Sequence, residues 1–98
     1  MTDETKEIKI ADKTFILHKA PIVQARKISI LYAPNDNGVI NAGTSQEGML
    51  MLMQYVSVRL DGGKEVALVT EDLINNHVPS VTALMQLEAA EFEFNFSS

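Results

Sequence analysis

The residues best suited to chemistry in this sequence are its two histidines. His18 and His77 lie far apart in the chain, and neither has a recognisable spacing to a second metal ligand or to a serine or cysteine nucleophile. A structural or surface role is therefore the favoured interpretation of both.

Several acidic and glycine residues also have simpler explanations than catalysis. The acids lie in predicted turns or at a predicted helix start, where carboxylates accept hydrogen bonds from backbone amides: Asp12, Asp61, Glu71 and Asp72. Gly62-Gly63 does not lead into a helix with the spacing of a phosphate-binding loop. Residues 36–38 lack the alternating acids and the final glutamate of a calcium loop. The sequence therefore predicts no catalytic residues, no cofactor and no metal site, and hence no enzyme.

The composition predicts a single domain over residues 1–98. The net charge of −5 argues against nucleic acid as a partner, because phosphate binding needs a clustered basic face. There is no cysteine, and no apolar run reaches the length of about 20 residues that spans a membrane. The charged N-terminus does not resemble a signal peptide. We expect a soluble intracellular protein without a membrane partner, with a loose segment at residues 1–6.

The elements that organise the first half begin with a predicted β-hairpin over residues 7–19, where apolar and polar residues alternate. Pro21 is suited to the first position of a helix, which we predict over residues 22–32. Pro34 ends this helix, because the residue before a proline avoids helical geometry. Residues 34–43 form the clearest predicted loop.

A second helix is predicted from Thr44, whose spacing to Glu47 is that of a capping box. We favour a helix that continues to about Arg59, because two apolar stripes continue through it. The alternative is that residues 55–60, rich in β-branched side chains, form a strand paired with residues 64–69.

The last third is predicted to contain a strand at Val66–Val69, a short helix capped by Thr70, and a final helix beginning at Pro79. The final helix has an apolar side made of Val81, Leu84, Met85 and Leu87. Together the elements predict an α+β fold. In it a small antiparallel sheet, the N-terminal hairpin plus one central strand, packs against three to four helices.

Two apolar features suggest a binding function. The second helix has a core stripe of Met49, Leu52, Met53, Val56 and Leu60, and a second stripe of Met51, Tyr55 and Val58. Near the C-terminus, phenylalanines alternate with polar residues. The favoured interpretation is a fraying helix end packed back on the core; the alternative is a mobile tail, 92–98, that binds a partner. The candidate partner-binding residues are Met51, Tyr55, Val58, Phe92, Phe94 and Phe96.

Several short segments resemble those of a known family in their order and spacing. They are Lys19-Ala20-Pro21 leading into Gln24-Ala25-Arg26-Lys27, the run 49–56, Asp61-Gly62-Gly63, Leu73 with Asn75-Asn76-His77-Val78-Pro79, and Phe94-Asn95-Phe96. Within residues 15–96 they resemble the small tail assembly chaperones of long-tailed bacteriophages. None of these segments is a catalytic signature.

The resemblance implies a non-enzymatic chaperone that binds the helical, hydrophobic tape measure protein and keeps it soluble before the tail tube polymerises. It also implies residence in the host cytoplasm and absence from the mature virion. In several relatives a frameshifted longer form recruits the tail tube protein. This chain would be the short form, or a family member that has no longer form. Two alternatives stay open: a structural tail or connector subunit retained in the virion, and a small regulatory adaptor protein.

Overall fold

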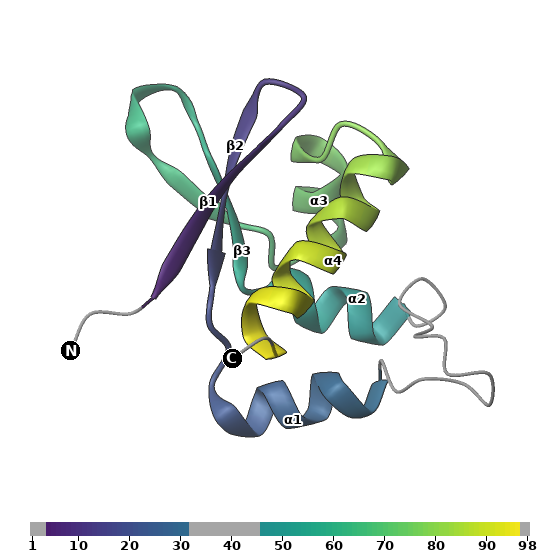
Figure 1. Ribbon diagram of the computed structural model, residues 1–98. Coiled ribbons are helices and arrows are strands. Elements are labelled where there is room, and N and C mark those ends of the chain that lie inside the picture. Colours follow the sequence, from purple (N-terminus) through teal and green to yellow (C-terminus); the bar gives the residue numbers. More distant parts are fainter. Residues whose placement is uncertain (1–3, 32–45, 97–98) are drawn as a thin grey trace.

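The computed structural model describes residues 4–31 and 46–96 (Figure 1). The elements in chain order are β1 (Thr5–Ile10), β2 (Lys13–His18), α1 (Ile22–Leu31), α2 (Gln46–Met53), β3 (Val56–Arg59), a 3₁₀ turn at Asp61–Gly63, β4 (Glu65–Ala67), α3 (Glu71–His77) and α4 (Val81–Phe96). The four strands form one antiparallel sheet in the order β1-β2-β3-β4. The predicted α+β class is confirmed.

The N-terminal hairpin forms where the alternating pattern predicts it. Ile8 pairs with Phe15 across the two strands. The two turn residues, Ala11 and Asp12, have φ values of 51° and 67°. Positive φ at both positions matches the right-handed twist of the flanking strands. Strand β1 begins at Thr5, inside the segment that the sequence suggests is loose.

The predicted long helix is wrong in its second half. Helix α2 ends at Met53, and residues 56–59 form β3, which pairs with β2 through Leu17 and Val56. The strand alternative is correct for this segment. Val56 and Val58 are fully buried, so their β-branched side chains are held by sheet packing, which outweighs the helical spacing of the same residues.

Strands β3 and β4 are joined by a turn in which Gly62 and Gly63 both have a φ of 87°. This left-handed geometry favours glycine, so the pair closes the hairpin. Strand β4 covers residues 65–67 and pairs with β3. It therefore joins the same sheet as the N-terminal hairpin, but not next to it.

The two C-terminal helices start at side-chain caps. Thr70 Oγ1 accepts a hydrogen bond from Leu73 N at 3.2 Å, which confirms the predicted cap of α3. Ser80 Oγ accepts from Ala83 N at 3.0 Å, so α4 begins after Ser80 and not at Pro79. Helix α4 continues to Phe96, through the segment interpreted as a fraying end.

Helix α1 follows Pro21 as predicted. Its predicted end at Pro34, the loop at 34–43 and the capping residue Thr44 lie outside the described residues.

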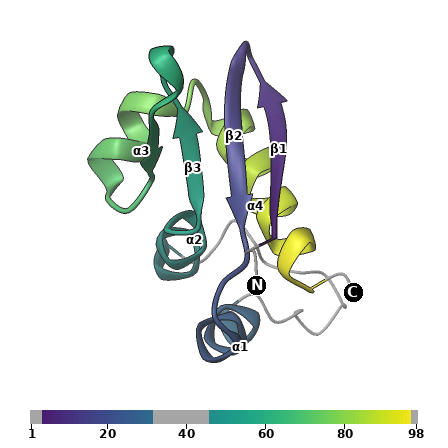
Figure 2. The ribbon, with the colours of Figure 1, turned by 90° about the vertical axis from the view of Figure 1, so that its left-hand side faces the viewer.

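Helices α2, α3 and α4 lie on one side of the sheet, and α1 lies beyond its end (Figures 1 and 2). The core fills the space between sheet and helices, and its buried members are Phe15, Leu17, Ile28, Leu52, Met53, Val56, Val58, Leu68, Ile74 and Leu87. On the opposite face an ion pair between Glu7 and Arg59 spans β2. Helix α4 therefore has the sheet and α2 along its inner side, which leaves its outer side as surface.

Candidate functional site

The structure separates the six residues that the sequence suggests for partner binding. Val58 is 1% exposed in β3 and belongs to the core, so it is not accessible to a partner in this structure. Met51 and Tyr55 are half-buried against the core. Neither forms the open apolar surface that the second stripe suggests.

The three phenylalanines lie on two sides of helix α4. Phe92 and Phe96 are neighbours, with ring centroids 4.5 Å apart, and Phe96 is 37% exposed. Phe94 lies on another side of the helix and packs under Lys19, whose Nζ is 4.7 Å from the ring centroid. The structure thus brings together two of the predicted residues on one flank of α4.

The same flank carries two exposed residues that the sequence places in the core. Val81 is 74% exposed and Met85 is 57% exposed, so the predicted apolar side of the last helix is wrong at both positions. Leu87 is fully buried and Leu84 is half-buried, as a core side requires. Helix α4 is apolar on more than one side, which is why its periodicity alone does not separate the core side from the exposed flank.

Together these residues form what we call the α4 stripe: Val81, Met85, Phe92 and Phe96. Their spacing of i, i+4, i+11 and i+15 places them on one flank of the helix, over a length of about 22 Å. At the start of the helix the stripe borders a groove of about 220 Å³ between α3 and α4. The groove is lined by Ile74, Asn75, Val78, Ser80, Val81 and Leu84. An apolar flank beside a groove is the geometry that receives an amphipathic helix.

A second exposed apolar surface lies on helix α1, which we call the α1 face: Ile22, Val23, Arg26, Lys27 and Ile30. All five residues are exposed, and Ile22 reaches 88%. Helix α1 packs on α2 through the buried Ile28, on its opposite side. The α1 face is therefore apolar and basic at once, with three aliphatic side chains around two cations.

A partly buried polar cluster joins the end of α4 to the junction between β2 and α1. Asn95 Oδ1 accepts a hydrogen bond from Ala20 N at 2.7 Å. Asn95 Nδ2 donates to Glu91 Oε2 at 2.6 Å and to the Glu91 backbone oxygen at 2.9 Å. One asparagine therefore links two segments that are 75 residues apart in the chain.

Glu91 itself is fully buried, and its Oε1 has no hydrogen-bond partner in the part of the chain that the structure describes. Burial raises the pKa of this carboxyl from 4.5 to about 8, against the opposing effects of Asn95, the Lys19 charge and a backbone hydrogen bond from His18. The side chain is therefore neutral at pH 7, because a buried charge without full pairing is costly. Sequence reasoning missed it, since a helical glutamate is usually exposed.

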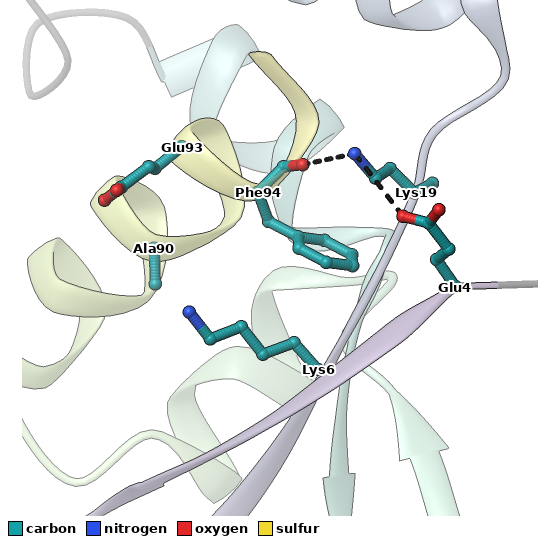
Figure 3. Close-up of a pocket in the computed structure, with 6 residues that line it drawn as sticks. All are labelled: Glu4, Lys6, Lys19, Ala90, Glu93 and Phe94. Carbon is teal, nitrogen blue, oxygen red and sulfur yellow. Dashed lines mark hydrogen bonds and ion pairs between the residues drawn. The ribbon is translucent and has the colours of Figure 1, made fainter. Parts of the chain in front are cut away.

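Lys19 adds a further link at the same junction. Its Nζ donates to the Phe94 carbonyl oxygen at 2.6 Å and lies 3.9 Å from Glu4 Oε2 (Figure 3). A cation beside the last carbonyls of a helix stabilises its C-terminal end. A shallow pocket of about 260 Å³ opens beside these contacts, lined by Glu4, Lys6, Lys19, Ala90, Glu93 and Phe94. Its mixed charges favour no single class of ligand.

The chemistry of the described residues offers no metal centre: within 4–31 and 46–96, no three His, Asp or Glu side chains gather to hold an ion. No helix in this part of the chain has the length and apolar character needed to cross a membrane. No protein-family model, curated protein or solved structure matches this chain. The α4 stripe with its adjoining groove is therefore the candidate functional site, on geometry alone.

Proposed function

We propose that this protein is a non-enzymatic tail assembly chaperone of a long-tailed bacteriophage, which binds the tape measure protein and keeps it in solution before the tail tube forms. The observation that carries the proposal is the α4 stripe. Three exposed apolar residues, Val81, Met85 and Phe96, lie at helical spacing with the half-buried Phe92, and the start of this stripe borders a groove. Together they form a surface suited to an amphipathic helical client.

Side-chain chemistry supports a client of varied sequence. Met85 is unbranched and flexible, and Phe96 is an aromatic residue at the partly exposed end of the stripe. Such side chains adapt to different apolar partners, which suits a long client with many similar helices. In the proposed scheme the complex forms in the host cytoplasm, and a frameshifted longer form recruits the tail tube protein.

The test is co-expression with the tape measure protein encoded by the same phage. The wild-type chain is expected to hold the client in the soluble fraction as a complex. Met85→Glu places a charge in the middle of the stripe, so it should weaken binding at least about tenfold, equivalent to about 1.4 kcal/mol. The matched control is Val69→Glu, which adds the same charge at a half-exposed valine outside the stripe.

Two outcomes would contradict the proposal. A client that stays soluble with Met85→Glu as well as it does with Val69→Glu would show that the stripe is not the binding surface. Detection of the chain in purified virions by mass spectrometry would favour a structural tail subunit, because an assembly chaperone leaves before the particle is complete.

A further inference from the structure

The last part of helix α4, residues 91–96, is attached to the domain differently from the rest of the helix. The fully buried apolar residues of α4, Ala83 and Leu87, both come before this segment. Within it, the three phenylalanines are half-buried or exposed. Segments with few buried apolar contacts open locally at a lower free energy than the core does. Residues 91–96 can therefore leave the domain while the first part of α4 stays packed.

Hydrogen bonds join this segment to the β2–α1 junction. Ala20 N donates to Asn95 Oδ1, and Lys19 Nζ donates to the Phe94 carbonyl oxygen. Asn95 Nδ2 in turn donates to Glu91 Oε2. We call this set the C-terminal latch: Lys19, Ala20, Glu91, Phe94 and Asn95. The position of Asn95, and with it the bond to Ala20, depends on Glu91.

Glu91 is the member of the latch whose state can change. It is fully buried, and among the described residues its Oε1 has no hydrogen-bond partner. A buried carboxylate is stable only when its charge is paired and its oxygens accept hydrogen bonds. Burial accordingly raises the pKa of Glu91 to about 8, from an ordinary value of 4.5. Ionisation therefore favours exposure of the carboxyl to water.

The nearby cations are bound to other groups. Lys19 opposes the rise in the pKa of Glu91, but its Nζ donates to a helix carbonyl oxygen and lies 3.9 Å from Glu4 Oε2. Lys6 of β1 lines the pocket drawn in Figure 3. Lys13 of β2 donates to a carbonyl oxygen of α3. Within the described part of the chain, none of these lysines forms an ion pair with Glu91.

The other titratable groups on the elements packed here supply no counter-charge. Glu88, almost one turn earlier on α4, is a second buried carboxyl, and like charges disfavour ionisation. Within Gln46–Met53, helix α2 carries one charged residue, Glu47, which is exposed at its first turn. Tyr55 follows α2 and is half-buried. His18, at the end of β2, is the remaining titratable neighbour.

We propose that the C-terminal latch is closed while Glu91 is protonated and opens when Glu91 ionises, so that residues 91–96 leave the β2–α1 junction as an arm. Ala83 and Leu87 hold the first part of α4 in the core during this change. The arm carries Phe92 and Phe96, so opening removes two of the four residues of the α4 stripe. Weaker client binding in the open state is a consequence that rests on the proposed function, whereas the latch itself does not.

The sign of the pH effect follows from the proton that the closed latch holds and the open arm releases to water. Below pH 4.5 both forms hold the proton. The ratio of open to closed arm rises about tenfold per pH unit between 4.5 and about 8, and it levels off above 8, where both forms are ionised. Between about pH 5.5 and about pH 7.5 it should therefore rise roughly a hundredfold.

Amide hydrogen exchange of the full chain, followed by NMR, measures this opening. The Ala20 amide reports the bond to Asn95, and the Phe94 amide reports the arm. Their protection factors, corrected for intrinsic exchange, should fall together roughly a hundredfold between about pH 5.5 and about pH 7.5. The buried Leu68 amide, bonded to Val56 O in the sheet, should stay at least about tenfold better protected at each pH.

Three variants separate the latch from other pH effects. Glu91→Gln cannot ionise, so its protection factors should be nearly independent of pH. Glu93→Gln removes an exposed carboxyl from the same segment and should behave like the wild type. Asn95→Ala removes the link but keeps the titrating group, so Phe94 should be poorly protected at both pH values. His18 is the same in all of them.

Wild-type and Glu91→Gln profiles that run parallel would overturn the proposal. So would Ala20 and Phe94 amides that exchange as slowly as Leu68, because the whole domain would then have to unfold to expose them. Strong protection of Phe94 in Asn95→Ala would show that the latch does not hold the arm. Since exchange is measured without a client, failure here leaves the proposed function standing, and the reverse also holds.

Discussion

The two ends of helix α4 meet their surroundings in different ways. At the C-terminal end, Asn95 and Lys19 form hydrogen bonds that join the helix to the β2–α1 junction. At the N-terminal end, Val81 and Met85 are exposed beside a groove. Directional polar contacts therefore hold the C-terminal end at a defined position, whereas the N-terminal end borders an open groove. Substitutions at the two ends of α4 test this difference, and Leu87, which lies between the ends, gives the largest expected effect.

Leu87→Ala should produce the largest loss of stability. Leu87 is fully buried in the core, so truncation leaves a cavity and should lower the free energy of unfolding by about 2–5 kcal/mol. Urea denaturation followed by circular dichroism measures the change. Gln86→Ala, at the exposed neighbouring position, is the control and should stay within about 0.5 kcal/mol. Equal losses of stability for Leu87→Ala and Gln86→Ala would contradict the burial of Leu87.

Asn95→Ala tests the polar end. It removes the partner of Ala20 N and of buried Glu91, so the free energy of unfolding should fall by about 1–3 kcal/mol. Ser80→Ala removes the cap at the other end and should cost about 1 kcal/mol. Denaturation of both variants compares the two ends directly, and a larger loss for Ser80→Ala would reverse the comparison.

The pH dependence of stability tests Glu91. Its pKa is about 8 in the folded protein against an ordinary value of 4.5, so between these values the folded state holds a proton that the unfolded state has lost. This contribution is complete below pH 4.5, declines by about 1.4 kcal/mol per pH unit above it, and is lost once the pH passes 8. Denaturation midpoints across this range should therefore fall more steeply for the wild type than for Glu91→Gln. Parallel profiles would refute a neutral, buried Glu91.

Met85→Glu should have the smallest effect on stability, within about 0.5 kcal/mol, because the residue is exposed. Thermal unfolding of this variant and the wild type measures the difference. A loss above 1.5 kcal/mol would mean that Met85 contributes to the core. A small loss qualifies the variant for the binding experiments, since any change in association then comes from the surface.

Local sequence signals were sufficient for the N-terminal hairpin and for the cap of α3. The alternation around Ile8 and Phe15, and the cap at Thr70, specify geometry through neighbours in the chain. They were insufficient at Val56, where a distant partner strand decides between helix and strand. They also failed at Met85, because α4 has more apolar sides than the core can cover.

The polar cluster at the C-terminal end of α4 is a different case. Asn95 and Ala20 are far apart in the sequence, so no local pattern reveals their hydrogen bond. The i, i+4 spacing of Glu91 and Asn95 is visible in the sequence, but it usually describes two exposed side chains. Only the packing of α4 against the sheet shows that Glu91 is buried.

The connection between β2 and β3 has a consequence for how the protein folds. Each hairpin is local, and hairpins form in about 1–10 μs. Leu17 and Val56, by contrast, must meet across the whole segment that contains α1 and α2. Closing this long loop lowers the entropy of the chain before any contact between the two strands stabilises it. Pairing of β2 with β3 should therefore be the slow step in folding. Until it occurs, the buried apolar residues of both hairpins remain open to water.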